Sequence, residues 1–144
     1  MNVSAVDRGV GLPDWHELLA AFVGATAASR HPITVWACEL GALYRKSCPQ
    51  HPVVAIRRME LIGAIDGWAA RYLRRSSSAK SVGAHVDRMA AATARALRAL
   101  RVCESVGDRE HAAWTAAAAL ADEWADIVSG MPPRRYGGPG AHGW

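Results

Sequence analysis

Asp66 is the side chain in this sequence that most needs a chemical explanation. Apolar residues around it recur at helical spacing, and a helical wheel places it between Met59 and Leu73, inside the apolar arc. An unpaired carboxylate in an apolar core costs several kcal/mol or is forced to take up a proton. Asp66 therefore needs a partner or a cavity, and a satisfied interhelical hydrogen bond or ion pair is the favoured explanation.

Glu39 is the second acid of interest, because it borders an apolar stripe that has Tyr44 on its other edge. Solvation of an acid in that position is common. The helices that carry Glu39 and Asp66 follow each other after a short corner and should be neighbours, so the two acids could face one cleft. Paired carboxylates can bind a cation or perform acid-base chemistry. A separation above about 10 Å, beyond any shared ligand shell, would rule out that cleft.

The histidines do not have metal-ligand spacing. A zinc-protease helix would need a second histidine where Ala20 follows His16-Glu17, and no glutamate has a histidine three residues later, as di-iron bundles require. His85 and Asp87 flank a predicted apolar stripe on opposite sides, which argues against one joint site. Phosphate-loop and dinucleotide glycine patterns are absent. We therefore expect no metal and no cofactor.

Basic residues cluster between residues 71 and 101. The cluster comprises Arg71, Arg74, Arg75, Lys80, Arg88, Arg95, Arg98 and Arg101. Such a patch could contact phosphates, and affinity for a nucleic acid would then fall steeply with salt. An ordinary solvated face is favoured, because no recognition motif accompanies the charges. We therefore do not expect a nucleic-acid partner.

Composition places the chain among single globular domains. It has 144 residues, a formal charge of +4, 51% apolar residues and six tryptophans, which should weigh heavily in the core. Three cysteines without a Cys-x-x-Cys motif indicate a reduced, cytoplasmic protein rather than a disulfide framework. No signal-peptide pattern and no run of about 20 apolar residues is present, so no membrane association is expected.

The residues that typically start and end helices, together with the apolar spacing between them, predict an all-α fold, a compact antiparallel bundle of about five helices. The expected organisation is an N-terminal arm at 1–12, a helical domain at 13–129 and a Pro/Gly-rich tail at 130–144. Asp14 should cap a helix that ends near Ala28, and His-Pro pairs mark the starts of helices at 32–47 and 52–73. Ser78 or Ser81 should cap the fourth helix, and Gly107-Asp108 separates it from a fifth that ends near Val128.

Two of these helices have predicted inward faces that the structure can test. For the helix at 52–73 the face is Met59, Ile62, Ile65, Ala69 and Leu73. For the fourth helix it is Val82, Val86, Met89, Thr93, Leu97 and Leu100, a stripe that should pack along its whole length.

Four segments carry a family resemblance: His31-Pro32, ELGALY from Glu39, ELIGAIDGW from Glu60, and SVGAHVDRMA from Ser81. With them, residues from about 31 to 128 resemble an all-helical actinobacterial family known as domain of unknown function 4254. The resemblance implies a fold and no activity. It singles out Glu39, Asp66, Trp68, Ser81, Gly83, Asp87 and Arg88. Members of that family often carry His-Thr-Glu where this chain has Ser78-Ala79-Lys80, so a site that includes those residues would be altered or lost here.

The leading functional expectation is a small cytoplasmic binding or adaptor protein that binds a protein partner or forms a homodimer, because no complete catalytic constellation is present. The alternative is an accessory enzyme or a small-molecule binder with a cleft lined by Glu39, Tyr44, Asp66 and His85. Phosphate contact through the basic patch is the third hypothesis.

Overall fold

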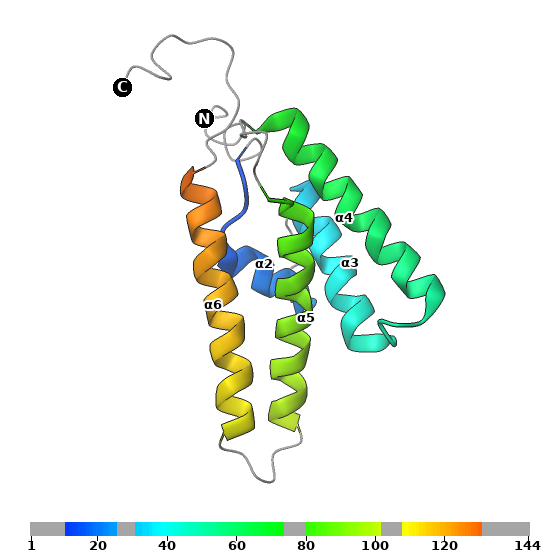
Figure 1. Ribbon diagram of the computed structural model, residues 1–144, viewed down its shortest axis with the longest axis vertical. Coiled ribbons are helices and arrows are strands. Elements are labelled where there is room, and N and C mark those ends of the chain that lie inside the picture. Colours follow the sequence, from blue (N-terminus) through cyan, green and yellow to red (C-terminus); the bar gives the residue numbers. More distant parts are fainter. Residues whose placement is uncertain (1–10, 26–30, 74–79, 102–107, 131–144) are drawn as a thin grey trace.

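Helices account for most of the chain in the computed structural model, which describes residues 11–25, 31–73, 80–101 and 108–130. With the labels of Figure 1, the helices are α2 (Trp15–Phe22), α3 (Pro32–Lys46), α4 (Pro52–Tyr72), α5 (Val82–Arg101) and α6 (Asp108–Gly130). The predicted all-α bundle is confirmed. The predicted arm and tail lie almost entirely outside the described residues.

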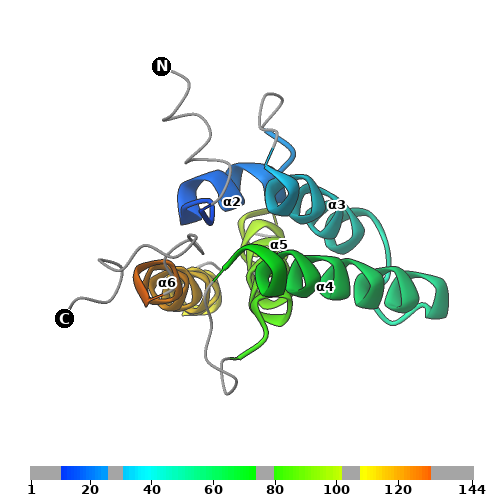
Figure 2. The same cartoon turned by 90° about the horizontal axis from the view of Figure 1, so that it is seen from above.

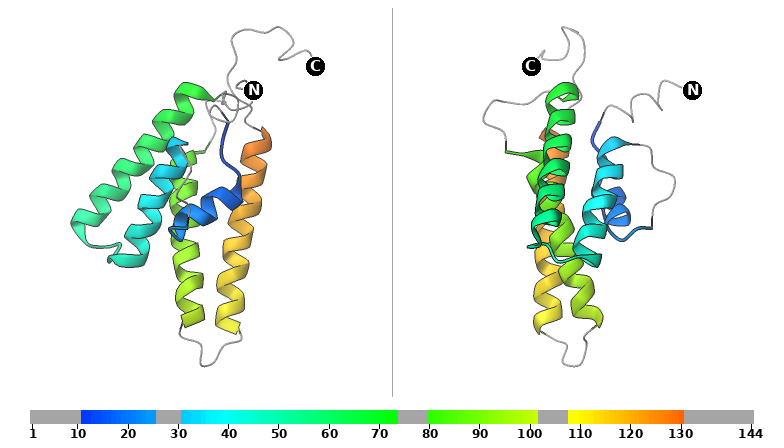
Figure 3. Two further views of the ribbon diagram at one scale, coloured as in Figure 1. Left: turned by 180° about the vertical axis from the view of Figure 1, so that it is seen from behind. Right: turned by 90° about the vertical axis from the view of Figure 1, so that its right-hand side faces the viewer.

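Helix α5 is the centre of the bundle, because it packs against each of the other four described helices. It pairs along its length with the antiparallel α6, while α3 and α4 form a hairpin beside it (Figure 1). Seen from above, α5 lies between α6 and this hairpin (Figure 2). The short α2 crosses the α5 and α6 pair instead of running along it (Figure 3). One short crossing helix therefore breaks the regular up-and-down arrangement.

The two His-Pro pairs start helices as predicted, and the histidines have a further role. His31 Nδ1 accepts a hydrogen bond from the backbone N–H of Ile33 at 3.1 Å, and His51 Nδ1 accepts one from Val53 at 3.2 Å. Each ring thus satisfies one of the free amide donors at its helix start, as a serine or aspartate cap does. Asp14 caps α2 in the same way, by accepting from the N–H of Glu17 at 2.9 Å.

Two glycines let helices approach backbone to backbone. A Cβ on Gly41 of α3 would overlap the backbone of Phe22, and a Cβ on Gly83 of α5 would overlap the carbonyl of Ile62. These contacts fix α2 against α3 and the start of α5 against α4. Both glycines are buried.

The core contains Trp124, whose side chain is wholly buried between the helices. Its indole N–H donates to the carbonyl of Pro13 at 2.9 Å, so the only polar atom of the ring is satisfied. This bond ties the start of α2 to the C-terminal half of α6. Trp68 is also buried, so two of the tryptophans among the described residues belong to the core, which partly confirms the expectation that tryptophans contribute strongly to it.

Three details of the sequence prediction are wrong. Helix α2 ends at Phe22 rather than near Ala28, because Gly24 adopts a positive φ of 77°. Met59 is 65% exposed, because the buried face of α4 centres on Leu61 and Ile65 and so lies about one position away from the predicted arc. Leu100 is 45% exposed, since α5 extends past the bulk of the core.

Candidate functional site

Asp66 has the partner that its position requires. It is half-buried on α4, where its Oδ2 accepts from the Ser81 hydroxyl at 2.6 Å and its Oδ1 accepts from the Gly83 N–H at 2.8 Å. Ser81 Oγ in turn accepts from the N–H of Ala84 at 2.9 Å and so caps α5. The negative charge lies at a helix N-terminus, where free amide donors and the helix dipole favour it. The Asp66 carboxylate therefore fastens α4 to the start of α5.

Asp87 forms a second closed contact, with Tyr44 and Arg58. The Tyr44 hydroxyl donates to the carboxylate at 2.9 Å, and Arg58 reaches both carboxylate oxygens, at 3.2 and 2.8 Å. The guanidinium also lies over the Tyr44 ring, 5.1 Å from its centroid. Burial, and then the charge of Asp87, raise the pKa of Tyr44, while the hydrogen bonds that Arg58 donates to Asp87 raise the pKa of Arg58. These three residues link α3, α4 and α5.

Glu39 does not share a cleft with Asp66. Both of its oxygens accept from Arg57, at 2.6 and 2.8 Å, and Arg57 also contacts Glu60 at 2.8 Å. The hydrogen bonds from Arg57 hold the pKa of Glu39 below its usual value. Arg57 and Asp66 are nine residues apart on α4, or about 13 Å along the helix axis. The two acids therefore bind at different levels of α4, and the predicted paired-carboxylate cleft is not formed.

His85 joins α5 to α6. It is buried, and its Nε2–H donates to the carbonyl of Leu120 at 3.0 Å. Its Nδ1 accepts from the guanidinium of Arg88 at 3.1 Å, with the exposed carboxylate of Glu123 3.8 Å away. His85 and Asp87 thus face different helices, as predicted, and they do not form one site.

The remaining predicted site residues are dispersed. Trp68 packs against the His31 ring, with centroids 4.8 Å apart, and against Tyr72. Described members of the basic patch are exposed, namely Arg71, Lys80, Arg88, Arg95, Arg98 and Arg101. Arg74, Arg75, Ser78 and Ala79 lie outside the described residues.

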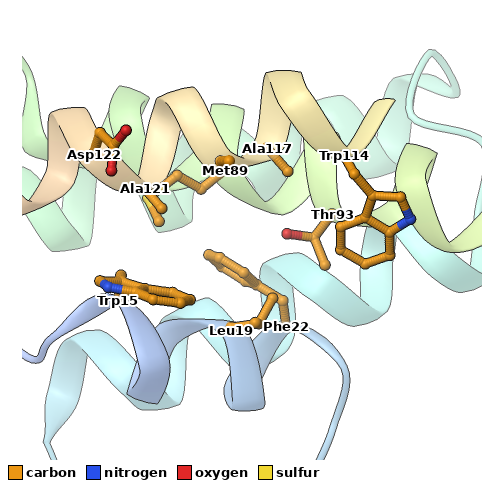
Figure 4. Close-up of a pocket in the computed structure, with 10 residues that line it drawn as sticks. Trp15, Leu19, Phe22, Met89, Thr93, Trp114, Ala117, Ala121 and Asp122 are labelled. Carbon is orange, nitrogen blue, oxygen red and sulfur yellow. The ribbon is translucent and has the colours of Figure 1, made fainter. Parts of the chain in front are cut away.

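A pocket that the sequence did not predict opens between α2, α5 and α6. Its volume is about 330 Å³, and Figure 4 shows its lining. The lining residues are Trp15, Leu19, Phe22, Met89, Thr93, Trp114, Ala117, Ala118, Ala121 and Asp122. Phe22 and Met89 are buried and form the apolar floor, while Trp15 and Trp114 are half-buried. Ligand pockets typically combine such apolar walls with a few polar groups.

Three alanines of α6 create the space. Ala117, Ala118 and Ala121 face α2 with side chains of one carbon, where larger residues would meet Leu19 and Phe22. The sequence does not show that α2, on the opposite side, leaves these alanines incompletely covered. The oblique crossing of α2 produces that gap, and the crossing depends on the close contact of Phe22 with Gly41.

In the described part of the chain, no group of three or more histidine, cysteine, aspartate or glutamate side chains is placed to hold a metal ion. None of the described helices combines the length and apolar character needed to cross a membrane.

Comparisons with known protein families, with curated proteins and with solved structures found no match to this chain. Within the described residues, the pocket between α2, α5 and α6 has the size and the apolar lining that suit a ligand.

Proposed function

We propose that this protein is a small binding module that holds an apolar molecule of one or two rings in the pocket between α2, α5 and α6. The observation that carries the proposal is a pocket of about 330 Å³ with two tryptophans and a phenylalanine in its walls. An apolar cavity of about 150 Å³ already accepts benzene in another protein. The pocket is therefore large enough for a bicyclic ligand.

The lining also sets the affinity to expect. A ligand that loses about 200 Å² of apolar surface to the pocket gains roughly 5 kcal/mol before the cost of association is subtracted, so this gain supports a Kd of about 0.2 mM at the tightest. Contacts between the ligand's rings and Trp15 or Trp114 would increase the affinity. A binding test must therefore extend to millimolar ligand.

The proposed pocket differs from the cleft expected from the sequence. That cleft required Glu39, Tyr44, Asp66 and His85 to face one ligand, whereas each of them is hydrogen-bonded to a different group. An enzyme that uses those side chains would first have to break the contacts that hold its helices together. Ligand binding in the apolar pocket needs no such change.

Titration with 2-naphthalenemethanol, followed by the indole N–H signals in NMR spectra, tests the proposal. We expect the signals of Trp15 and Trp114 to shift with saturation, because both rings line the pocket. Ala117→Leu should abolish the shifts by filling the space, and Ala121→Leu is a second blocking variant. Ala119→Leu is the matched control, since Ala119 is exposed on α6 and is not in the lining. No shift at saturation of solubility, or equal binding by Ala117→Leu and the control, would refute the proposal.

A second candidate function, association with another copy of this chain, is favoured by one face of α4. Val53, Ile56 and Met59 are 60–68% exposed there, and the same face continues into the exposed Gly63 and Gly67. In an antiparallel pair of α4 helices, the large residues of one copy meet the glycines of the other, which is the self-complementarity that a two-fold dimer needs. Sedimentation should show a dimer that Ile56→Glu converts to monomer, whereas a wild-type monomer at millimolar concentration would exclude this candidate.

The cytoplasmic location expected from the sequence remains part of the proposal. Its support is that the two described cysteines, Cys38 and Cys48, are free thiols.

A further inference from the structure

Asp122 is the one charged side chain in the lining of the pocket. It is exposed on α6, and within the described part of the chain it takes part in no hydrogen bond or ion pair. This sets it apart from Asp66, Asp87 and Glu39, each of which has a specific donor. A carboxylate beside an apolar cavity and without a cation of its own is a natural partner for a positively charged group of a ligand.

Trp15 lies at the same end of the pocket as Asp122. Figure 4 shows these two side chains at one end, and Trp114 with Thr93 at the other. The face of an indole ring attracts a cation, so a positive charge at this end would meet both a carboxylate and an aromatic ring. The opposite end offers no charged side chain among the lining residues.

The charged residues near Asp122 on α6 also favour a positively charged group at this end of the pocket. The pocket wall on α6 carries no lysine or arginine after Arg109, while Glu123 and Asp126 lie close to Asp122 in sequence and are exposed. The whole chain has a net charge of +4, which by itself favours anions. A preference for cations would therefore have to come from this site and not from the overall charge.

We propose that the natural ligand of this pocket is a cationic aromatic molecule, an amine carried on one or two rings. The rings occupy the apolar space below α6, and the ammonium group lies between the Asp122 carboxylate and the Trp15 ring. This inference rests on the proposed binding function and adds the charge of the ligand and its direction in the pocket.

Three probes with the same bicyclic body separate charge from shape. They are 2-naphthylmethylamine, 2-naphthalenemethanol and 2-naphthoate, each titrated at low salt and followed by the Trp15 and Trp114 indole signals. We expect the amine to bind about tenfold more tightly than the alcohol, because an exposed ion pair and a cation–π contact each contribute modestly. The carboxylate should bind most weakly.

Two variants assign the preference to its residue. Asp122→Asn should reduce the advantage of the amine to about threefold, the part contributed by the cation–π contact with Trp15, and leave the affinity for the alcohol unchanged. Asp126→Asn, which removes an exposed acid of α6 outside the lining, should keep the full preference. Raising the salt concentration should weaken the amine and not the alcohol.

Each outcome decides one of the two proposals. Equal affinity for amine and alcohol, or a preference that Asp122→Asn leaves undiminished, overturns the cationic ligand while the pocket remains a binding site. Equal weakening of amine and alcohol by Asp122→Asn also overturns it, because the residue would then act on the pocket's shape. Failure of all three probes to bind overturns the proposed function itself.

Discussion

At the scale of single residues, the acids that looked most reactive in the sequence hold helices together. Asp66 connects the consecutive helices α4 and α5, Asp87 connects α5 to α3 and α4, and each carboxylate is hydrogen-bonded on both oxygens. The need of Asp66 for a partner could be predicted from its apolar surroundings. The identity of that partner could not, because Ser81 and Gly83 lie beyond a loop whose path the sequence does not specify.

Arg58 shows what residue-level prediction missed. It precedes Leu61 and Ile65 by three and seven residues on α4, so it occupies a position of the inward-facing repeat. An arginine in such a position signals a buried acid elsewhere. That signal was present in the sequence, and Asp87 is the acid.

Removal of the Asp87 carboxylate should be costly. Asp87→Ala leaves the half-buried Arg58 charge and the Tyr44 hydroxyl without their acceptor, and we expect the free energy of unfolding to fall by about 3 kcal/mol. Urea unfolding measures the change. Asp126→Ala, at an exposed position, should change it by less than about 0.5 kcal/mol. The triple change Tyr44→Phe, Arg58→Met and Asp87→Leu should recover most of the loss, and equal stabilities of Asp87→Ala and Asp126→Ala would contradict this account.

His31 should make the stability depend on pH. Burial lowers its pKa, although the hydrogen bond to the Gly11 carbonyl and the charge of Glu17 act in the opposite direction. The unfolded chain therefore takes up a proton at a higher pH than the folded one, and stability present above the usual histidine range, about pH 6.5, is lost as the pH falls toward the lowered pKa. Protonation also removes the Nδ1 acceptor that caps α3.

Comparison with His31→Asn isolates this effect. The asparagine side chain can accept from the Ile33 N–H but does not titrate. Between pH 7.5 and pH 5, the free energy of unfolding should fall more for the wild type than for the variant. An equal fall in both proteins would show that His31 does not carry the pH dependence.

At the scale of elements, the sequence predicted where helices begin better than where they end. The His-Pro pairs mark the starts of α3 and α4, and Ser81 caps α5 as expected. The end of α2 was missed because apolar spacing continues through the sequence beyond Phe22, whereas the chain turns at Gly24. The inward face of α4 was misplaced because its exposed Val53, Ile56 and Met59 are as apolar as its buried residues.

Replacement by alanine should change the free energy of unfolding in opposite directions at Gly63 of α4 and at Gly83 of α5. A Cβ on the exposed Gly63 meets nothing within 4 Å, so Gly63→Ala should raise the free energy of unfolding by about 0.5–1 kcal/mol through helix propensity. Gly83→Ala should lower it by about 2 kcal/mol, because the Cβ would overlap the Ile62 backbone. Thermal or urea unfolding of dilute protein distinguishes the two. Stabilisation by both substitutions would mean that α4 and α5 are not in backbone contact.

At the scale of the whole molecule, the pocket follows from the arrangement of helices rather than from any motif. Helix α5 touches every other described helix, so the bundle is held together around it. The short α2 crosses over α5 and α6 and leaves the alanines of α6 incompletely covered. A helical wheel treats those alanines as an ordinary packed face, which is why the sequence could not reveal the pocket.

Empty space in a pocket lowers the stability of a fold, so a substitution that fills the pocket should raise the free energy of unfolding. Ala117→Leu should raise the free energy of unfolding by about 1 kcal/mol, since the added carbons bury apolar surface in existing space. The same substitution should abolish naphthyl binding, so stability and binding would change in opposite directions. Ala119→Leu, at an exposed position, should change neither. Destabilisation by Ala117→Leu would show that the space between α2 and α6 is too small in solution for a side chain of four carbons, and therefore for a ring.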